Sequence, residues 1–317
     1  MLLAGVAVVA VEAWPRAVVR TSEPLASAER PPPATVDSVG VAADPAGAPA
    51  GTPGADEIDP ARLQARAIAQ LESLLESPSV RIQRIAAMAL ARTKHEAALT
   101  VLRSMMKAEA SPLVVVQIAY SLARAGDQHG HEMLLESLGS KQRDVKLDAA
   151  RSLVQLGDDA GAGQLRGMLS YTHYRVGAAE LLARLGDPAG SKALHAERDD
   201  PRGTDEVKRR ATVGLGMAGE QSVRDELVAI LEDGRYQVGA ALALAALKDP
   251  AAVPPLVNQL DIDAFRVAAA VSLRRLGATV DLEPLAAALH AGNDVFRVTA
   301  AEAILILTGP PELSERD

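Results

Sequence analysis

From about residue 59 onward, apolar positions recur with the spacing of one face of an α-helix, and one pattern returns eight times. The segments YRVGAAELLARLGDP, FRVAAAVSLRRLGA and DVKLDAARSLVQLGDD share an apolar residue, a small pair, then Leu, then Gly. Aligned on that last residue, here called the anchor, the repeats are 29 to 33 residues apart, with anchors at Lys94, Gly126, Gly157, Gly186, Gly219, Lys248, Gly277 and Thr308. Each repeat is predicted to be a pair of helices, A then B.

Positions outside the aligned Gly support this register. Four residues before each anchor lie Leu90, Leu122, Leu153, Leu182, Leu215, Leu244, Leu273 and Ile304. Eight residues after an anchor lie Leu102, Leu134, Leu165, Leu194, Leu227, Leu256 and Leu285. Twelve residues before each anchor is a third apolar slot, which we predict to be buried: Ile82, Val114, Val145, Tyr174, Val207, Tyr236, Phe265 and Phe296.

The turns between repeats carry recognisable helix-end signals. In LGDP, residues 185–188, Gly186 suits the left-handed residue that ends a helix, Asp187 suits the N-cap of the next helix, and Pro188 suits its first turn. At the start of the B helices, we expect three further N-caps, each three residues ahead of a basic residue: Asp205, Asp263 and Asp294.

A single pair of helices of this length cannot bury its apolar face, so the pairs must stack on one another. The predicted fold class is therefore all-α, an α-solenoid of about eight stacked helical hairpins spanning residues 58–309. Before it we expect an apolar segment, residues 1–20, and a disordered tether rich in Pro, Ala and Gly, residues 21–57. A short tail, residues 310–317, follows it.

The segment DPAAVPPLVNQLDIDAFRVAAAVSLRRLG, residues 249–277, resembles the short HEAT-like repeats of phycobilisome (bilin) lyases. The resemblance extends over roughly residues 59–309 and implies the solenoid fold. It also implies one of two functions: a protein-binding scaffold, or an enzyme or enzyme subunit such as a bilin lyase or an oxidoreductase of the deoxyhypusine hydroxylase type.

In deoxyhypusine hydroxylase, His-Glu pairs on equivalent repeats converge on a di-iron centre. This chain has two such pairs, His95-Glu96 and His131-Glu132, but they fall at different distances after their anchors. Non-equivalent positions cannot form a symmetric cluster. The run DQHGHEMLLESL, which contains the second pair, is better interpreted as the first turns of an A helix, on which His129 and His131 point about 200° apart. We therefore expect no catalytic residues, no cofactor and no metal site.

The composition of the chain limits the classes of partner and of chemistry that it can support. A net charge of -8 and a pI near 5.4 argue against a nucleic-acid-binding protein, which normally carries a basic face. The absence of cysteine excludes disulfides, thiolate catalysis and cysteine-bound zinc. The function indicated is a non-enzymatic scaffold or adaptor that binds another protein.

A basic row two residues before the anchors is the best candidate for protein binding: Arg92, Arg124, Arg184 and Arg275. In an α-solenoid the B helices normally line the concave surface, where such a row would meet an acidic face or peptide. The competing interpretation is that a cation near a helix C-terminus is favoured by the helix dipole, typically by about 0.3–1 kcal/mol. A second basic set opens the B helices and is predicted to join neighbouring repeats: Lys146, Arg175, Lys208, Arg266 and Arg297.

The N-terminal run MLLAGVAVVAVEAW is apolar but shorter than a membrane span and has no basic residue ahead of it. We interpret it as a truncated signal or membrane anchor, with a loosely packed apolar tail as the alternative. This interpretation favours a membrane-anchored or exported (periplasmic) location over a cytoplasmic one, and it limits membrane contact to this segment.

Overall fold

The computed structural model describes residues 58–233 and 236–310. The predicted anchor or signal segment (1–20), the tether (21–57) and all but the first residue of the tail (310–317) lie outside the described residues. Within these ranges there are sixteen α-helices in eight A and B pairs, as the repeat pattern predicts.

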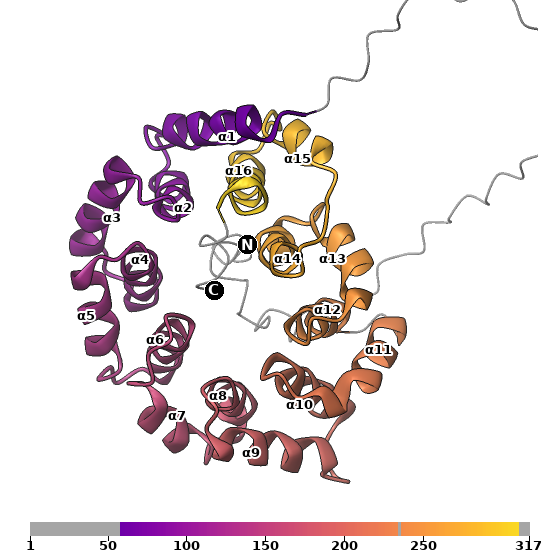
Figure 1. Ribbon diagram of the computed structural model, residues 1–317. Coiled ribbons are helices and arrows are strands. Elements are labelled where there is room, and N and C mark those ends of the chain that lie inside the picture. Colours follow the sequence, from indigo (N-terminus) through magenta and orange to yellow (C-terminus); the bar gives the residue numbers. More distant parts are fainter. Residues whose placement is uncertain (1–57, 234–235, 311–317) are drawn as a thin grey trace, which may run out of the picture.

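The pairs form two concentric layers of a closed ring (Figure 1). The outer layer holds the A helices α1 (Pro60–Leu74), α3 (Glu96–Ala108), α5 (Gln128–Ser137), α7 (Ala162–Met168), α9 (Pro188–Asp199), α11 (Arg224–Asp233), α13 (Val253–Gln259) and α15 (Glu283–Ala288). The inner layer holds the B helices α2 (Val80–Ala91), α4 (Pro112–Arg124), α6 (Arg143–Gln155), α8 (Thr172–Arg184), α10 (Asp205–Met217), α12 (Gln237–Ala246), α14 (Asp263–Arg275) and α16 (Asp294–Thr308). Two 3₁₀ turns, η2 (Gln221–Val223) and η3 (Pro250–Ala252), precede α11 and α13.

The ring closes because the last B helix packs against the first repeat. Helix α16 lies between α14 and α2 in the inner layer and is covered on its outer side by α1 (Figure 1). The sequence predicts the stacking of the pairs but not their curvature, so this closure is a finding of the structure. It gives the ring two edges: the B–A edge, where a B helix turns into the next A helix, and the A–B edge, where A turns into B.

The predicted anchors mark the B–A turns. Seven of the eight adopt positive φ, five of them glycines and two of them lysines, Lys94 at +56° and Lys248 at +59°. Asp187 caps α9 by accepting a hydrogen bond from the backbone N–H of Ala189, as predicted. The eighth anchor, Thr308, instead ends α16 as its last helical residue.

The predicted caps of the B helices are one residue out of place. Asp205, Asp263 and Asp294 are each the first helical residue, and the N-caps are Thr204, Ile262 and Asn293. The physical reason is visible in the last two repeats, where the carboxylates of Asp263 and Asp294 form ion pairs with Arg266 and Arg297. A carboxylate aimed at an arginine one turn along the helix is not available to cap the backbone.

The slot twelve residues before the anchor is less buried than predicted. Ile82 and Val145 are buried, but Tyr174, Tyr236 and Phe265 are only half-buried, and 36% of Phe296 is exposed. The slot lies at the start of each B helix, near the A–B edge, so a large ring there projects beyond the covering A helix.

Successive repeats approach closely at the position four residues after the anchor. A Cβ built on Gly190 of α9 would lie 2.3 Å from the backbone N of Ala183 and 2.5 Å from the carbonyl O of Ala179, both in α8. Gly130 of α5 meets α4 in the same way, with the backbone of Ala119 and Ala123 at 2.7 Å. The small residue therefore sets how near an A helix can come to the preceding B helix.

Replacing Gly190 tests this contact. We expect Gly190→Ala to lower the free energy of unfolding by about 1–3 kcal/mol, because the added methyl group overlaps helix backbone that cannot move aside. The matched control is Gly177→Ala in α8, where the nearest atom to the new Cβ is Leu147 Cδ2 at 4.0 Å. That substitution should stabilise the helix by up to about 1 kcal/mol. Urea unfolding followed by circular dichroism measures both; equal effects of the two substitutions would contradict the close approach.

Candidate functional site

A ladder of charged side chains joins successive A helices along the B–A edge. Each link runs from a basic or histidine side chain of one A helix to the acidic residue that directly follows the next anchor. The links are Arg103–Asp127 (2.6 Å), His131–Asp158 (2.7 Å), Arg166–Asp187 (2.7 Å), His195–Glu220 (3.0 Å) and Arg224–Asp249 (2.5 Å). Because the arginines are 40–59% exposed, these links contribute more to register than to stability.

Three carboxylates of the ladder are held in the charged form. For Asp127, burial raises the pKa, but hydrogen bonds from Arg103 and from the backbone of Gly130 outweigh it, so the pKa lies below its usual value. The pKa values of Asp187 and Asp249 are lowered mainly by hydrogen bonds from the backbone N–H groups of Ala189 and Ala251, and further by Arg166 and Arg224. Capping and pairing therefore act on the same carboxylates.

The ring closure is held by a buried ion pair that the sequence analysis missed. Arg92 Nε, just after α2, donates to Glu302 Oε1 of α16 at 2.6 Å, and the two side chains are only 4% and 1% exposed. On the outside, Arg66 Nη2 of α1 donates to His290 Nε2, which lies between α15 and α16, at 2.8 Å. Pairing between residues 210 positions apart leaves no local signal in a single sequence.

The structure places the four arginines of the predicted binding row at the inner ends of the B–A edge. Arg124, Arg184 and Arg275 are the last residues of α4, α8 and α14, and Arg92 is the C-cap of α2. Arg92 and Arg124 stand on neighbouring helices, whereas the other two lie elsewhere around the ring (Figure 1). Arg92 forms an ion pair with Glu302. Arg124 and Arg184 are half-buried, and Arg275 is exposed. A binding role for the row stays a prediction.

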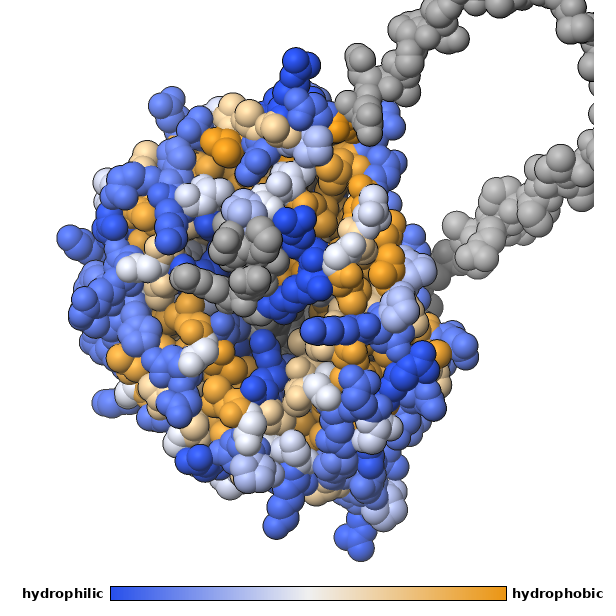
Figure 2. Space-filling view, viewed as in Figure 1, coloured by the Kyte–Doolittle hydropathy of each residue, from blue (hydrophilic) through white to orange (hydrophobic). Residues whose placement is uncertain are grey.

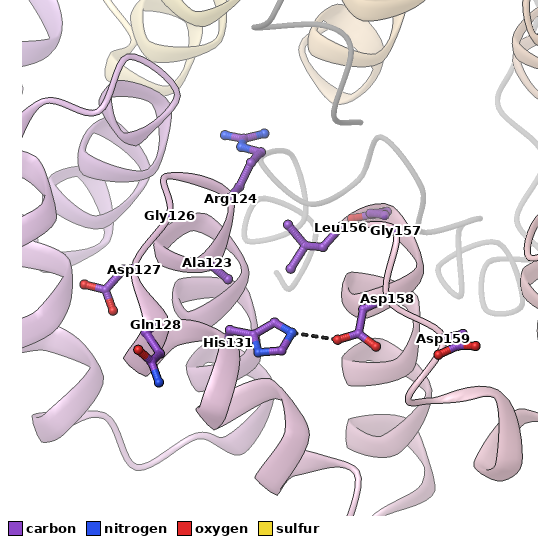
Figure 3. Close-up of a pocket in the computed structure, with 11 residues that line it drawn as sticks. Ala123, Arg124, Gly126, Asp127, Gln128, His131, Leu156, Gly157, Asp158 and Asp159 are labelled. Atoms are coloured by element: carbon purple, nitrogen blue, oxygen red, sulfur yellow. Dashed lines mark hydrogen bonds and ion pairs between the residues drawn. The ribbon is translucent and has the colours of Figure 1, made fainter.

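A pocket of about 770 Å³ opens beside Arg124, between the second and third repeats. His131 and Asp158, which contact each other, line it, and Asp127, Gln128 and Asp159 complete its polar wall (Figure 3). The guanidinium carbon of Arg124 lies 5.5 Å from the centre of the Tyr120 ring, which holds the side chain by a cation–π contact. His131 Nε2 lies 2.7 Å from the Asp158 carboxylate, and none of the described residues that line this pocket carries a hydroxyl, thiol or amine side chain.

The histidine-rich run at the start of α5 is a helix start, as predicted. Asp127 caps α5 by accepting from the backbone N–H of Gly130, and Gly130 packs on α4. The two His-Glu pairs do not converge, because His95 contacts Glu72 while His131 contacts Asp158. Within residues 58–233 and 236–310, no three His, Asp or Glu side chains come together as a potential metal site.

Among the basic residues that open the B helices, two arginines join neighbouring repeats, as predicted. A third, Arg297, pairs instead with Asp294 of its own helix. Arg266, 3% exposed, donates to the carbonyl of Leu260, to Asp263 and to Thr299 of the next B helix. Arg175 likewise donates to the carbonyl of Leu169 and to Glu197. For Lys146 and Lys208 the described part of the chain shows no such contact.

Fold and register together define an α-solenoid of HEAT-like repeats. Residues 237–261, which cover α12 and α13, match the family described as PBS lyase HEAT-like repeat. The match has the length of one repeat and covers the B helix of the sixth pair and the A helix of the seventh. No curated protein sequence matches it.

The chain also matches two solved structures, both with a TM-score below 0.5. The complex of CpcE and CpcF of phycocyanin lyase from Nostoc sp. PCC7120 is 18% identical, with 81% of this chain and 98% of that chain covered and a TM-score of 0.44. Human deoxyhypusine hydroxylase, in complex with glycerol, is also 18% identical, with 78% and 97% covered and a TM-score of 0.36. At this distance neither activity is carried over to this chain.

Removing the carboxylate of the closure pair tests its contribution. We expect Glu302→Ala to lower the free energy of unfolding by about 3–5 kcal/mol, because it leaves the Arg92 guanidinium buried without its counter-ion. The double variant Arg92→Met, Glu302→Leu, which replaces both charges with apolar groups, should recover most of that loss. Urea unfolding of the three proteins measures the effect, and a double variant no better than Glu302→Ala would contradict the role of the pair.

The capped carboxylates predict a dependence of stability on pH. A carboxyl group whose folded pKa is depressed stabilises the fold above its unfolded pKa, and that contribution is lost as pH falls through the folded pKa. Asp187→Asn keeps a capping side chain but loses the charge, so it should destabilise the protein at pH 7 and have little effect at pH 2. Urea midpoints at the two pH values measure this; an equal difference at both would show that the charge does not contribute.

Proposed function

We propose that the ring is a non-enzymatic scaffold that binds another protein through the B–A edge of its inner layer. The observation that supports this most is the row formed where three consecutive inner helices end, at Arg124, Gln155 and Arg184, all half-buried, beside the 770 Å³ pocket. Arginine and tyrosine are enriched at the centres of protein interfaces, and Arg124 with Tyr120 supplies both. The partner presents an acidic face or peptide to this row.

The geometry of a ring favours such a role. Neighbouring B helices present equivalent positions at regular intervals, so an extended acidic segment can be met at several repeats in succession. The phycocyanin lyase structure is a complex of CpcE with CpcF. For this ring, we propose a protein partner on the geometry of its inner layer alone.

Charge reversal at the row tests the proposal. The full chain and its Arg124→Glu, Arg184→Glu variant are immobilised, and the proteins they recover from extracts of the source cells are compared. We expect a partner that binds the unaltered chain and is lost from the variant, with retention by a matched control, Lys192→Glu, on the outer helix α9. Circular dichroism confirms that each variant is folded. A partner that binds all three proteins equally would place the interface elsewhere.

The alternative is an enzyme or enzyme subunit of the same repeat family, of the bilin lyase or deoxyhypusine hydroxylase type. Metal analysis and an absorption spectrum of the purified full chain separate the two proposals. Stoichiometric iron or a bound chromophore would replace the scaffold proposal by the enzyme one, and a colourless, metal-free protein would support the scaffold.

We also propose that residues 1–20 anchor or export the protein, so that membrane contact is confined to that segment. Among the described helices, none combines the length and the apolar character that a bilayer crossing needs. Fractionation of cells that express the full chain, or a chain lacking residues 1–20, tests the proposal, which fails if both chains are found in the same fraction.

A further inference from the structure

Three exposed large apolar side chains of the described residues lie at the N-terminal ends of three neighbouring inner helices, on the A–B edge. Val80 is 64% exposed and begins α2, Ile262 is 44% exposed and caps α14, and Phe296 is 36% exposed in the first turn of α16. These helices are consecutive in the inner layer, because α16 packs between α14 and α2 across the ring closure (Figure 1). Figure 2 shows hydrophobic side chains gathered inside a largely hydrophilic outer rim.

Contacts of Arg266 hold two of the three residues in place. Its guanidinium carbon lies 5.3 Å from the centre of the Phe296 ring, and its backbone N–H donates to the carbonyl of Ile262 at 2.8 Å. Arg266 is itself 3% exposed and fully engaged, so Phe296 rests on a fixed support. An exposed aromatic ring held in one orientation loses little conformational entropy when a partner covers it.

Arg81, the next residue after Val80, is a half-buried cation without a counter-ion. Its Nε and Nη2 atoms are inaccessible to solvent and have no hydrogen-bond partner, and in the described part of the chain no carboxylate pairs with it. A desolvated guanidinium without a partner is costly, and binding a carboxylate would offset that cost through charge-assisted hydrogen bonds.

The first repeat also lacks the ion pair that opens the last two B helices. Asp263 and Asp294 lie fourteen residues before their anchors, and each pairs with the arginine one turn further along its helix. In the first repeat Val80 stands in place of the aspartate and Gln83 in place of the arginine, so Arg81 is a separate cation outside this pair. At this one point of the closure an exposed valine stands where the two preceding B helices carry an aspartate.

We propose that Val80, Arg81, Ile262 and Phe296, here called the closure patch, bind a short segment of a partner protein that carries an apolar side chain next to a carboxylate. The carboxylate pairs with Arg81, and the apolar side chain covers Val80 and Phe296. The N-terminal ends of α2, α14 and α16 add the positive ends of three helix dipoles to the same place. The closure patch is on the edge opposite to the row of Arg124 and Arg184, so it is a second docking surface and does not depend on the first.

Peptide binding to the full chain tests the closure patch. The probes are an array of short synthetic peptides in which Leu or Phe stands beside Glu, with matched arrays that carry Gln or Lys in place of Glu; fluorescence anisotropy gives the affinities. We expect acidic peptides to bind at least about tenfold more tightly than their Gln counterparts, since a charge-assisted pair of this kind contributes about 1.5–3 kcal/mol. No binding by any acidic peptide, or equal binding of Glu and Gln peptides, would overturn the proposal.

Two variants place the binding on the patch. Arg81→Gln should reduce the affinity about tenfold, and Val80→Asp should abolish it, because the new carboxylate removes the apolar contact and repels the acidic probe. Val80→Asp introduces the residue that the seventh and eighth repeats already carry at this position, so thermal unfolding should show an intact fold. Unchanged binding by both variants would contradict the assignment.

Controls separate the other possible occupants. Val257→Ala, at an exposed site on the outer helix α13, and Arg124→Glu, Arg184→Glu, on the other edge, should both leave peptide affinity unchanged. Vesicles of phosphatidylcholine and phosphatidylserine should not bind; binding that Arg81→Gln removes would assign the patch to a lipid surface instead. Concentration-dependent self-association that Val80→Asp removes would assign it to a second copy of this chain. Either result overturns the proposal of a partner peptide.

Discussion

The whole ring depends on one contact made again and again, the packing of each A helix on the preceding B helix across a small residue. In the second to the seventh repeats, the residue four positions after the anchor is buried, is followed four positions later by a buried Leu, and is small in every repeat but the sixth: Ala98, Gly130, Gly161, Gly190, Val223 and Ala252. Where this residue is Gly130 or Gly190, backbone meets backbone with no room for a methyl group. The distance between layers, and with it the path of the chain, follows from that contact.

The closure of the ring uses the same packing of an A helix on a B helix. Helix α1 carries the same signature, with Ala67 and Leu71 both fully buried, and it packs on α16 as each other A helix packs on the B helix before it. Nine consecutive residues of α16, from Val298 to Ile306, are buried, so this helix has the environment of an interior element although it is the last of the described helices. The pair of Arg92 and Glu302 then fixes one register for the joint, since a charge buried without its partner is strongly unfavourable.

Much of this architecture could be predicted from sequence because the information is local and repeated. The anchors, the cap Asp187 and the helical start at Asp127 follow from turn chemistry within a few residues. The prediction was wrong where side chains had a competing partner, as with Asp263 and Asp294, or where the edge of a layer leaves a ring uncovered, as with Phe296. Closure and the unpaired Arg81 could not be predicted, because both depend on which repeats meet at the joint.

A closed ring of repeats has a property that an open array lacks. An open solenoid can gain or lose a repeat with a modest change in stability, because each repeat contacts only its neighbours and the two ends are free. Here the rotations between successive repeats must add up to bring α1 back onto α16. An added or deleted repeat would therefore change the rotation required between every other pair of repeats. The copy number of the repeat is therefore a geometric constant of this molecule.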